Sequence, residues 1–322
     1  MLNAQAWLVL EAVHLARGGR PVLRGLDCSL AGHAVGLVGA NGAGKTTLIA
    51  AMLGVLQAER GRIDVLGLEI PRQAMQLRSR AGVMAEQAGI FPGGSGVDAV
   101  AFAGALSGLD RREALRRAHR ALDALGVGEE RYRPTAGYST GMRQKCKLGM
   151  CLLHEPELLI LDEPTLGLDP ATRSELLGLI RELRDRGTRM LLSTHILQDA
   201  ELVCDELLLL EGGVVRYSGP TAGLMGEDRN IAVARGAGLG PELAARLREA
   251  GVIVLDCKAG EIRFESSDEA LRSFWRLAAE AGAEVRHLGA EVRSLEEAVV
   301  SMMRAPAPSP GPGAEGANHA RG

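Results

Sequence analysis

Lysine is scarce in this sequence of 322 residues, and arginine supplies almost all of its positive charge. The four lysines are Lys45, Lys145, Lys147 and Lys258. Lysine and arginine together number 37 against 40 acidic residues, so the formal net charge is −3. Proteins that bind duplex nucleic acid usually carry a strong basic excess. The composition therefore gives no reason to expect a nucleic-acid partner. Because lysine is so rare in this chain, a lysine inside a motif is not expected there by chance.

Cysteine is also rare, and its positions form no metal-binding pattern. The five residues are Cys28, Cys146, Cys151, Cys204 and Cys257. Their number is odd, no two have C-x-x-C spacing, and no histidines stand at zinc-finger spacing. We therefore expect free thiols in a reducing compartment, with neither a disulfide framework nor a zinc cluster.

A long hydrophobic run is missing as well. A helix that spans a bilayer takes ~20 consecutive apolar residues, but the run at 207–210 stops at Glu211. The N-terminal run AWLVL is cut short by Glu11 and lacks the basic region of a signal peptide. We therefore expect a soluble, cytoplasmic chain, whose role at a membrane requires a partner.

Glycines are closely spaced in the stretch GLVGANGAGKTT at residues 36–47. Residues 39–46 match G-x-x-x-x-G-K-[ST], in which loop amides surround phosphates, the lysine reaches the β- and γ-phosphates and the hydroxyl holds Mg²⁺. A helix that follows directs its positive end at the same anion. We expect the Lys45 amine to face solvent before nucleotide binds. The candidate nucleotide ligands are Gly39, Asn41, Gly42, Ala43, Gly44, Lys45, Thr46 and Thr47, with Thr46 also a metal ligand.

The residues around this motif predict an alternation of buried strands and helices. An apolar run at 34–39 precedes the motif, and a helix is predicted over 45–56. Two further apolar runs, 156–164 and 189–195, predict buried strands that end in acidic residues and in a histidine. Open parallel sheets are covered by helices and place their ligands at the carboxyl ends of the strands. We therefore expect an α/β fold with a mostly parallel core sheet.

The chain divides into three parts by pattern. Residues 1–225 carry the predicted sheet, with a helical lobe inserted at about 93–153. Residues 226–304 alternate short strands and helices, which predicts a small α+β domain for which a ferredoxin-like fold is one candidate. Residues 305–322 are rich in proline, alanine and glycine without an apolar stripe, and we expect them to be disordered.

Three more stretches follow the glycine-rich loop in order. They are YSTGMRQ at 138–144, LLILDEPTLGLDP at 158–170 and LLSTHILQDAE at 191–201. Together with GANGAGKTT at 39–47, they resemble the nucleotide-binding subunit of ATP-binding cassette (ABC) transporters. The resemblance covers about residues 8–220. It implies a P-loop NTPase fold, ATP and Mg²⁺ as cofactors, and ATP hydrolysis coupled to transmembrane transport.

The resemblance also implies roles for three residues at strand ends. Asp162 holds Mg²⁺, and Glu163 orients and polarises the attacking water. His195 contacts the γ-phosphate and keeps that water in line. Adjacent acids at a strand end point in opposite directions, so their two tasks separate.

The signature stretch implies a second copy of the chain. By resemblance, Ser139 and Gly141 touch the γ-phosphate of an ATP bound to that copy, so two chains close over two ATP molecules. Asp169, in the segment GLD, communicates with the other subunit. Thr140 and Met142 replace the second glycine and the glutamine of the common LSGGQ signature, as is typical of bacterial export-type cassettes. Because Ser139 and Gly141 are retained, we expect catalytic activity.

Two positions depart from the family pattern and leave alternatives open. The aromatic side chain that stacks on adenine is missing from residues 15–23, and Arg17 stands at its place. A planar guanidinium can stack on a base, but a solvated loop arginine is the equal alternative. The glutamine that contacts Mg²⁺ falls in residues 83–89, where Glu86 matches by position and Gln87 matches by chemistry.

Two other functions compete with a transporter subunit. A soluble ABC ATPase not coupled to transport usually has two cassettes in tandem or a long coiled-coil insertion, and a P-loop kinase for small molecules has no use for the signature stretch. The ending SLEEAVVSMM at 294–303 resembles exporters whose permease is a separate polypeptide. This favours two ATPase chains bound to the inner face of the cell membrane through an integral permease, working in export. By the same resemblance, the permease recognises the cargo.

Overall fold

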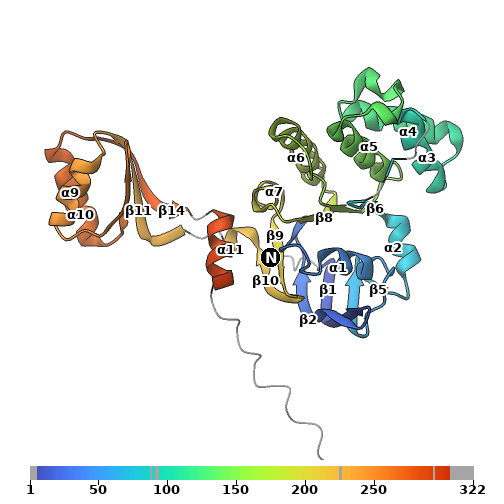
Figure 1. The fold of residues 1–322 in the computed structure, drawn as a ribbon, viewed down its shortest axis with the longest axis horizontal. Helices are drawn as coiled ribbons and strands as arrows, with labels where there is room; N and C mark the ends of the chain where they lie inside the picture. The colour runs from blue at the N-terminus through green and yellow to red at the C-terminus, as the bar shows by residue number, and fades with distance from the viewer. Residues whose placement is uncertain (1–5, 88, 91–93, 225–226, 293, 305–322) are drawn as a thin grey trace, which may run out of the picture. The chain divides into compact units, whose positions relative to one another are not determined.

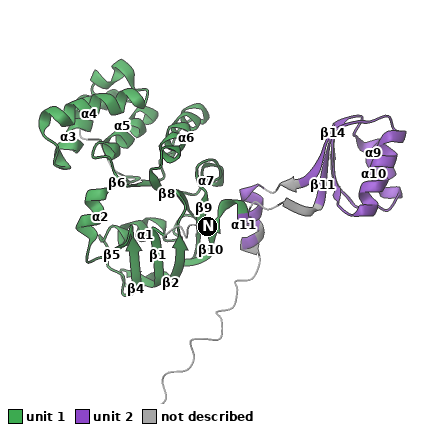
Figure 2. Cartoon of the chain, turned by 180° about the vertical axis from the view of Figure 1, so that it is seen from behind, with its two compact units in different colours: residues 1–222, 307–322 green, residues 223–306 purple. Residues whose placement is uncertain are grey.

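The computed structural model divides into two compact units, coloured separately in Figure 2. The first extends to residue 222, and the second covers residues 223–306. The residues that the structure describes are 6–87, 89–90, 94–224, 227–292 and 294–304. The tail at 305–322, for which disorder was expected, lies outside the described residues, and so does position 93, where the predicted lobe begins.

A six-stranded sheet forms the centre of the first unit (Figure 1). Its strand order is β10-β9-β3-β8-β7-β6, and all neighbours pair in parallel except β9 and β10. Every residue of β3 and β7 is buried, as expected for central strands covered on both faces. The mostly parallel sheet is therefore confirmed. Its strands are β3 (Ala34–Val38), β6 (Ala81–Met84), β7 (Leu158–Asp162), β8 (Arg189–Thr194), β9 (Glu206–Glu211) and β10 (Val214–Pro220).

Helix α1 (Lys45–Met52) follows β3 through the glycine-rich loop. Its apolar residues belong to the same core as those of β3, β7 and β8. The predicted helix over 45–56 is too long, because Gly54 adopts a left-handed φ of +64° and its amide bonds to Ala51. Helices α6 (Pro170–Asp185) and α7 (Leu197–Val203) follow β7 and β8, which completes the alternation of strands and helices.

A second, antiparallel sheet was not predicted. Its strand order is β2-β1-β4-β5, followed along the chain by helix α2 (Ala74–Arg80). Gly18 and Gly19 form the turn between its first two strands with φ of +58° and +76°, values that favour glycine. This turn leaves Arg17 at the end of its strand, near the glycine-rich loop. The strands are β1 (Leu8–Arg17), β2 (Arg20–Leu30), β4 (Arg60–Val65) and β5 (Leu68–Ile70).

The lobe between β6 and β7 is helical, as expected. Its helices start at side-chain caps: Ser95 exchanges hydrogen bonds with Asp98, Asp110 caps the next helix, and Ser139 caps the third. The three helices lie together beside the parallel sheet (Figure 1). The elements are α3 (Gly96–Leu106), α4 (Arg111–Ala124), the short 3₁₀ turns Gly128–Tyr132 and Thr135–Gly137, and α5 (Thr140–Leu152).

The second unit has the element order β-α-β-β-α-β, which is the split βαβ arrangement. Its four strands are antiparallel in the order β12-β13-β11-β14, and α9 and α10 lie on one face of that sheet (Figure 1). Phe264 and Phe274 stack in its core with ring centroids 5.1 Å apart. The elements are β11 (Glu227–Ala237), α9 (Pro241–Glu249), β12 (Val254–Lys258), β13 (Glu261–Glu265), α10 (Asp268–Glu280) and β14 (Glu284–Val292), flanked by α8 (Thr221–Leu224) and α11 (Leu295–Arg304).

All five cysteines are free. Burial raises the pKa of the Cys146 thiol to about 11 and that of the Cys151 thiol to about 12. Thiols with such pKa values stay protonated at neutral pH and pack as small apolar groups.

The separate core of the second unit leads to a first prediction. Phe264→Ala removes a fully buried ring and should destabilise this unit by about 3–5 kcal/mol. ATP affinity should be retained, because the core of the first unit shares no residue with this one. Chemical denaturation and calorimetric titration measure the two quantities. Trp275→Ala, at a side chain that is 51% exposed, is the control with a much smaller loss, and a lost ATP affinity in Phe264→Ala would contradict the independence of the two cores.

Candidate functional site

A cavity of about 480 Å³ lies at the carboxyl ends of β3, β7 and β8. The glycine-rich loop, the two acids after β7 and the histidine after β8 all contribute to its wall, as expected for parallel strands that end at one edge. The lining residues are Arg17, Val22, Ala40, Asn41, Gly42, Gly44, Lys45, Thr46, Thr47, Glu86, Asp162, Glu163, Leu166 and His195. Gly39 and Ala43 belong to the loop without lining the cavity.

Three glycines of the loop have no substitute. Gly42 and Gly44 take φ of +82° and +106°, in the region that side chains disfavour. A Cβ on Gly39 would stand 2.4 Å from the carbonyl oxygen of Leu210, so a side chain there requires the backbone to move. The loop can therefore approach phosphate closely and present its amides to it.

The Lys45 amine does not face solvent, contrary to our expectation. The side chain is only 7% exposed, and Nζ donates to the carbonyl oxygen of Gly39 at 2.7 Å. Nζ also lies 3.6 Å from Oε1 of Glu163. The sequence did not reveal this pairing, because it joins the loop to a strand end far along the chain. A buried ammonium group is stable only with such partners.

Glu163 occupies an unusual backbone conformation directly after β7. Its φ is +50°, and its amide donates to the carbonyl oxygen of Ser193 at 2.9 Å. A left-handed φ outside glycine costs free energy and is often found at functional sites. Oε2 of Glu163 lies 2.9 Å from Nδ1 of His195, whose side chain is 39% exposed. The arrangement presents one carboxylate to a lysine and a histidine at the same cavity wall.

Asp162 turns to a different group from its neighbour. Its Oδ2 lies 3.4 Å from Oγ1 of Thr46, which therefore donates a long hydrogen bond. Its buried Oδ1 has no hydrogen-bond partner among the described residues, and Oγ of Ser193, at the paired position on β8, has none there either. Unsatisfied buried oxygens need an explanation such as an ion or a water molecule. A carboxylate and a hydroxyl suit Mg²⁺, which prefers oxygen ligands.

The described residues contain no group of three or more histidine, cysteine or acidic side chains that could hold a metal ion. Mg²⁺ in nucleotide enzymes commonly takes one or two carboxylates plus substrate phosphates and water. Glu86 lines the cavity, and Gln87 is not among the lining residues. The loop that carries Glu86 is tied to the signature helix, since Lys147 Nζ donates to the Glu86 carbonyl oxygen at 3.3 Å.

The signature residues stand apart from this cavity. Ser139 caps α5 and accepts from the amide of Met142 at 3.2 Å. Gly141 packs on α6, where a Cβ in its place would be 2.3 Å from the Thr172 methyl group. Asp169 caps α6, and the Thr172 hydroxyl, followed by the amides of Thr172 and Ala171, lowers its pKa below the ordinary value. None of Ser139, Gly141 and Asp169 lines the cavity.

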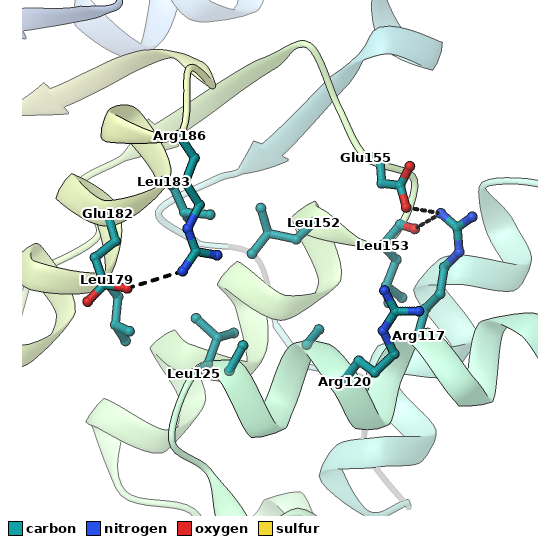
Figure 3. A pocket seen from close by; sticks show the side chains of 12 residues that line it. Arg117, Arg120, Leu125, Leu152, Leu153, Glu155, Leu179, Glu182, Leu183 and Arg186 are labelled. Atoms are coloured by element: carbon teal, nitrogen blue, oxygen red, sulfur yellow. Dashed lines mark hydrogen bonds and ion pairs between the residues drawn. The ribbon is translucent and has the colours of Figure 1, made fainter.

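A second cavity, of about 320 Å³, lies between α4, the end of α5 and α6 (Figure 3). Leucines from these elements form much of its wall, and two of its three arginines contact acidic residues of the same wall. It holds neither a glycine-rich loop nor any other motif residue. A polyphosphate therefore fits the first cavity, with its lysine and loop amides, and not the second.

Val22 and Leu166 line the nucleotide cavity without having been predicted. Val22 comes from β2, in the antiparallel sheet that the sequence did not reveal. Leu166 stands inside the stretch at 158–170, but the resemblance assigned it no role. Val22 also stands inside the stretch at 15–23 that the resemblance links to the adenine contact, so both residues lie in stretches with a predicted function but had no role of their own.

The chain is similar in sequence to known ATP-binding proteins. A family model for ABC transporters matches residues 24–166. The daunorubicin resistance ATP-binding protein DrrA3 of Streptomyces coeruleorubidus is 33% identical over 299 residues, which are 91% of this chain and 95% of that protein. The linearmycin resistance ATP-binding protein LnrL of Bacillus subtilis is 31% identical over 207 residues, 64% of this chain and 67% of LnrL. The chain belongs to the ATP-binding proteins of ABC transporters.

Solved structures of ABC proteins agree with this assignment. cbiO1 from Clostridium perfringens, part of the ABC transporter complex cbiONQ, matches with a TM-score of 0.62 and 28% identity over 68% of this chain and 90% of that chain. An ATP-binding subunit of another ABC transporter matches with a TM-score of 0.59 and 30% identity, covering 68% and 91%. The P-loop ABC ATPase fold expected from the resemblance is thus confirmed.

This ABC protein is an ATP-binding and ATP-hydrolysing subunit of a transporter, as the resemblance implied. Subunits of this family work with membrane permeases, so the comparisons favour a transporter subunit over a small-molecule kinase or an ATPase without a transport partner. No helix within the described ranges combines the length and hydrophobicity that crossing a membrane requires.

Lys45→Ala tests the assignment of the cavity. It should lower ATP affinity at least about tenfold, because charge-assisted hydrogen bonds to phosphate are among the strong ones. It should also lower stability, since Glu163 loses a buried counter-charge. Calorimetric titration with ATP and thermal denaturation measure these effects. Lys258→Ala, at a largely exposed lysine of the second unit, is the matched control, and unchanged affinity in Lys45→Ala would refute the assignment.

Proposed function

We propose that two copies of this ABC subunit close around two ATP molecules and thereby drive a separate integral membrane permease in export. The observation that carries the proposal is the contact of Glu163 with both Lys45 and His195 at the wall of the P-loop cavity. In this proposal the three residues serve as general base, phosphate-binding cation and γ-phosphate contact of one site. The signature segment of a second copy supplies the contact that completes it.

Glu163 is the proposed base for the attacking water. Its carboxylate oxygens face different partners, Oε1 toward Lys45 at 3.6 Å and Oε2 toward His195 at 2.9 Å. Phosphate oxygens of ATP compete for the Lys45 amine, because they offer stronger charge-assisted hydrogen bonds than a carbonyl oxygen. Binding of ATP would then release Oε1 of Glu163 to accept a hydrogen bond from water, while His195 holds the other oxygen.

Thr46 and Asp162 are the proposed protein ligands of Mg²⁺. Their side-chain oxygens are near each other, and one Asp162 oxygen has no partner in the described part of the chain. Of the two alternatives in the next loop, we propose Glu86 because it lines the cavity, and we set Gln87 aside. Mg²⁺ bound there neutralises charge on the phosphate oxygens of the nucleotide.

Arg17 is the proposed platform for adenine. It lines the cavity at the end of β1, it is exposed, and no ion pair holds it in the described structure. Its guanidinium is therefore free to stack on a base, an arrangement that a planar cation supports.

Arg17→Ala should weaken ATP binding by about fivefold or more, since stacking on aromatic or arginine platforms contributes on the order of 1–3 kcal/mol. Arg20→Ala is the matched control, because Arg20 pairs with Arg17 across the same hairpin and does not line the cavity. Calorimetric titration of both variants decides the point. Equal affinities in the two variants would show that the base rests on another group, such as Val22.

The signature residues support a site shared between two copies. Ser139 and Gly141 do not line the cavity of their own chain, so a contact with γ-phosphate has to be made in another copy. Asp169 caps α6 and accepts a hydrogen bond from the Thr172 hydroxyl, and the Thr172 methyl group packs against Gly141. The segment GLD is therefore linked to the signature residues through Thr172. Loss of the γ-phosphate removes the contact that holds the two copies together.

Glu163→Gln should trap the closed pair. Glutamine keeps the shape of the side chain but does not accept a proton, so ATP binds and is not hydrolysed. With ATP and Mg²⁺ this variant should run as a dimer in light scattering, whereas the natural sequence with ADP should run mainly as a monomer.

Adding Ser139→Arg to the trapped variant should return it to monomer, because a bulky cation at the α5 cap blocks closure on the second copy. A dimer that persists with ADP would indicate association through the unit at 223–306 instead. If Glu163→Gln stays monomeric with ATP, the shared site is wrong.

Export is supported by the relatives and not by the cavity. DrrA3 and LnrL are named for resistance to daunorubicin and linearmycin, and removal from the cell is a direct route to resistance. DrrA3 also matches 91% of this chain, which extends beyond the ATPase unit. The cargo of this transporter is set by its permease.

A further inference from the structure

Asp199 is a buried acidic residue outside the nucleotide cavity. It stands on α7, four residues after His195, and is only 1% exposed. A buried carboxylate is costly unless donors surround it. Here Thr165 donates its hydroxyl to Oδ2 at 2.5 Å, and Arg173 donates Nε to Oδ1 at 2.7 Å. A second guanidinium nitrogen of Arg173 lies 2.6 Å from the same oxygen.

The two donors come from segments that follow Glu163. Thr165 is buried and stands two residues after Glu163, in the loop between β7 and α6. Arg173 lies in the first turns of α6, and its amide bonds to the carbonyl oxygen of Asp169. The Asp199 carboxylate therefore joins α7 to the loop and to α6 at one point.

The hydrogen bond of Thr165 and the contact of Glu163 with His195 close a ring. From Glu163 the chain runs two residues to Thr165, crosses to Asp199, and returns four residues to His195. The left-handed backbone of Glu163 persists only where its surroundings hold it. Within this ring, the link between Thr165 and Asp199 is the one buried away from the cavity.

We propose that Asp199 is a positioning residue for hydrolysis: through Thr165 it sets the placement of Glu163 against His195. This rests on the function proposed above for those two residues. The expected effect is on kcat and not on ATP binding, because Asp199 is not among the residues that line the nucleotide cavity. If the contacts of Asp199 were merely structural, their removal would lower stability and leave the turnover of the folded protein unchanged.

Thr165→Val is the sharpest variant, because it removes the hydroxyl and keeps the branched shape. With the full chain, Mg²⁺ and ATP, kcat should fall about tenfold while KM stays within about twofold. Thr165→Ser retains the donor and should restore kcat close to that of the natural sequence. Asp199→Asn should also lower kcat. If Asp199→Asn folds poorly, Thr165→Val still tests the proposal.

Asp205→Asn is the matched control. Asp205 accepts from the backbone amides of His33 at 2.9 Å and Ala34 at 2.6 Å, and touches no residue of the ring. It should lose stability without losing kcat. An unchanged kcat in Thr165→Val, or an equal loss in Asp205→Asn, would overturn the role of Asp199. Glu163→Gln distinguishes a failure of this inference from a failure of the proposed function. If Glu163→Gln abolishes hydrolysis and Thr165→Val leaves kcat unchanged, only the role of Asp199 is wrong. If Glu163→Gln hydrolyses ATP normally, the proposed function is wrong as well.

Discussion

Two adjacent buried carboxylates at the end of one strand are the constraint on which the ATP site depends. Asp162 and Glu163 are both nearly inaccessible to solvent, where unpaired charge is strongly disfavoured. The glycine-rich loop supplies a partner for each carboxylate, Lys45 for Glu163 and Thr46 for Asp162. Thr46 and Asp162 are 116 residues apart in the sequence. Loop and strand therefore hold each other in place before nucleotide binds.

The glycine pattern follows from the same constraint. For Lys45 to reach Glu163, the loop must turn back over the end of β3, and the carbonyl groups of Gly39 and Ala40 then face the lysine. Gly42 and Gly44 supply the left-handed backbone of that turn, and Gly39 permits close approach to β9. Other residues in these positions would need strain or a shifted strand. The same geometry leaves the positive end of α1 directed at the cavity.

Local patterns predicted the central strands of the parallel sheet and the stretches that meet at the cavity. Strands β7 and β8 lie within the predicted ranges 156–164 and 189–195, where consecutive apolar residues form the centre of each strand, so each is specified by a short stretch of chain. The antiparallel sheet was missed because β1 and β2 pair with several register shifts, which break the alternation of apolar and polar residues. The burial of Lys45 and the donors around Asp199 were missed because their partners lie far along the chain.

Helix α6 connects the two halves of the site that we propose is shared between two copies. Its first turns contact the signature helix through Thr172 against Gly141, and the Thr172 hydroxyl donates to the cap Asp169 at 2.6 Å. One residue further on, Arg173 binds Asp199, which also holds the loop that carries Glu163. The segment that would meet a second copy and the segment that carries the proposed base therefore rest on the same turn of one helix. Because a Cβ on Gly141 would stand 2.3 Å from the Thr172 methyl group, the signature helix has no room to move toward α6 unless Thr172 moves as well.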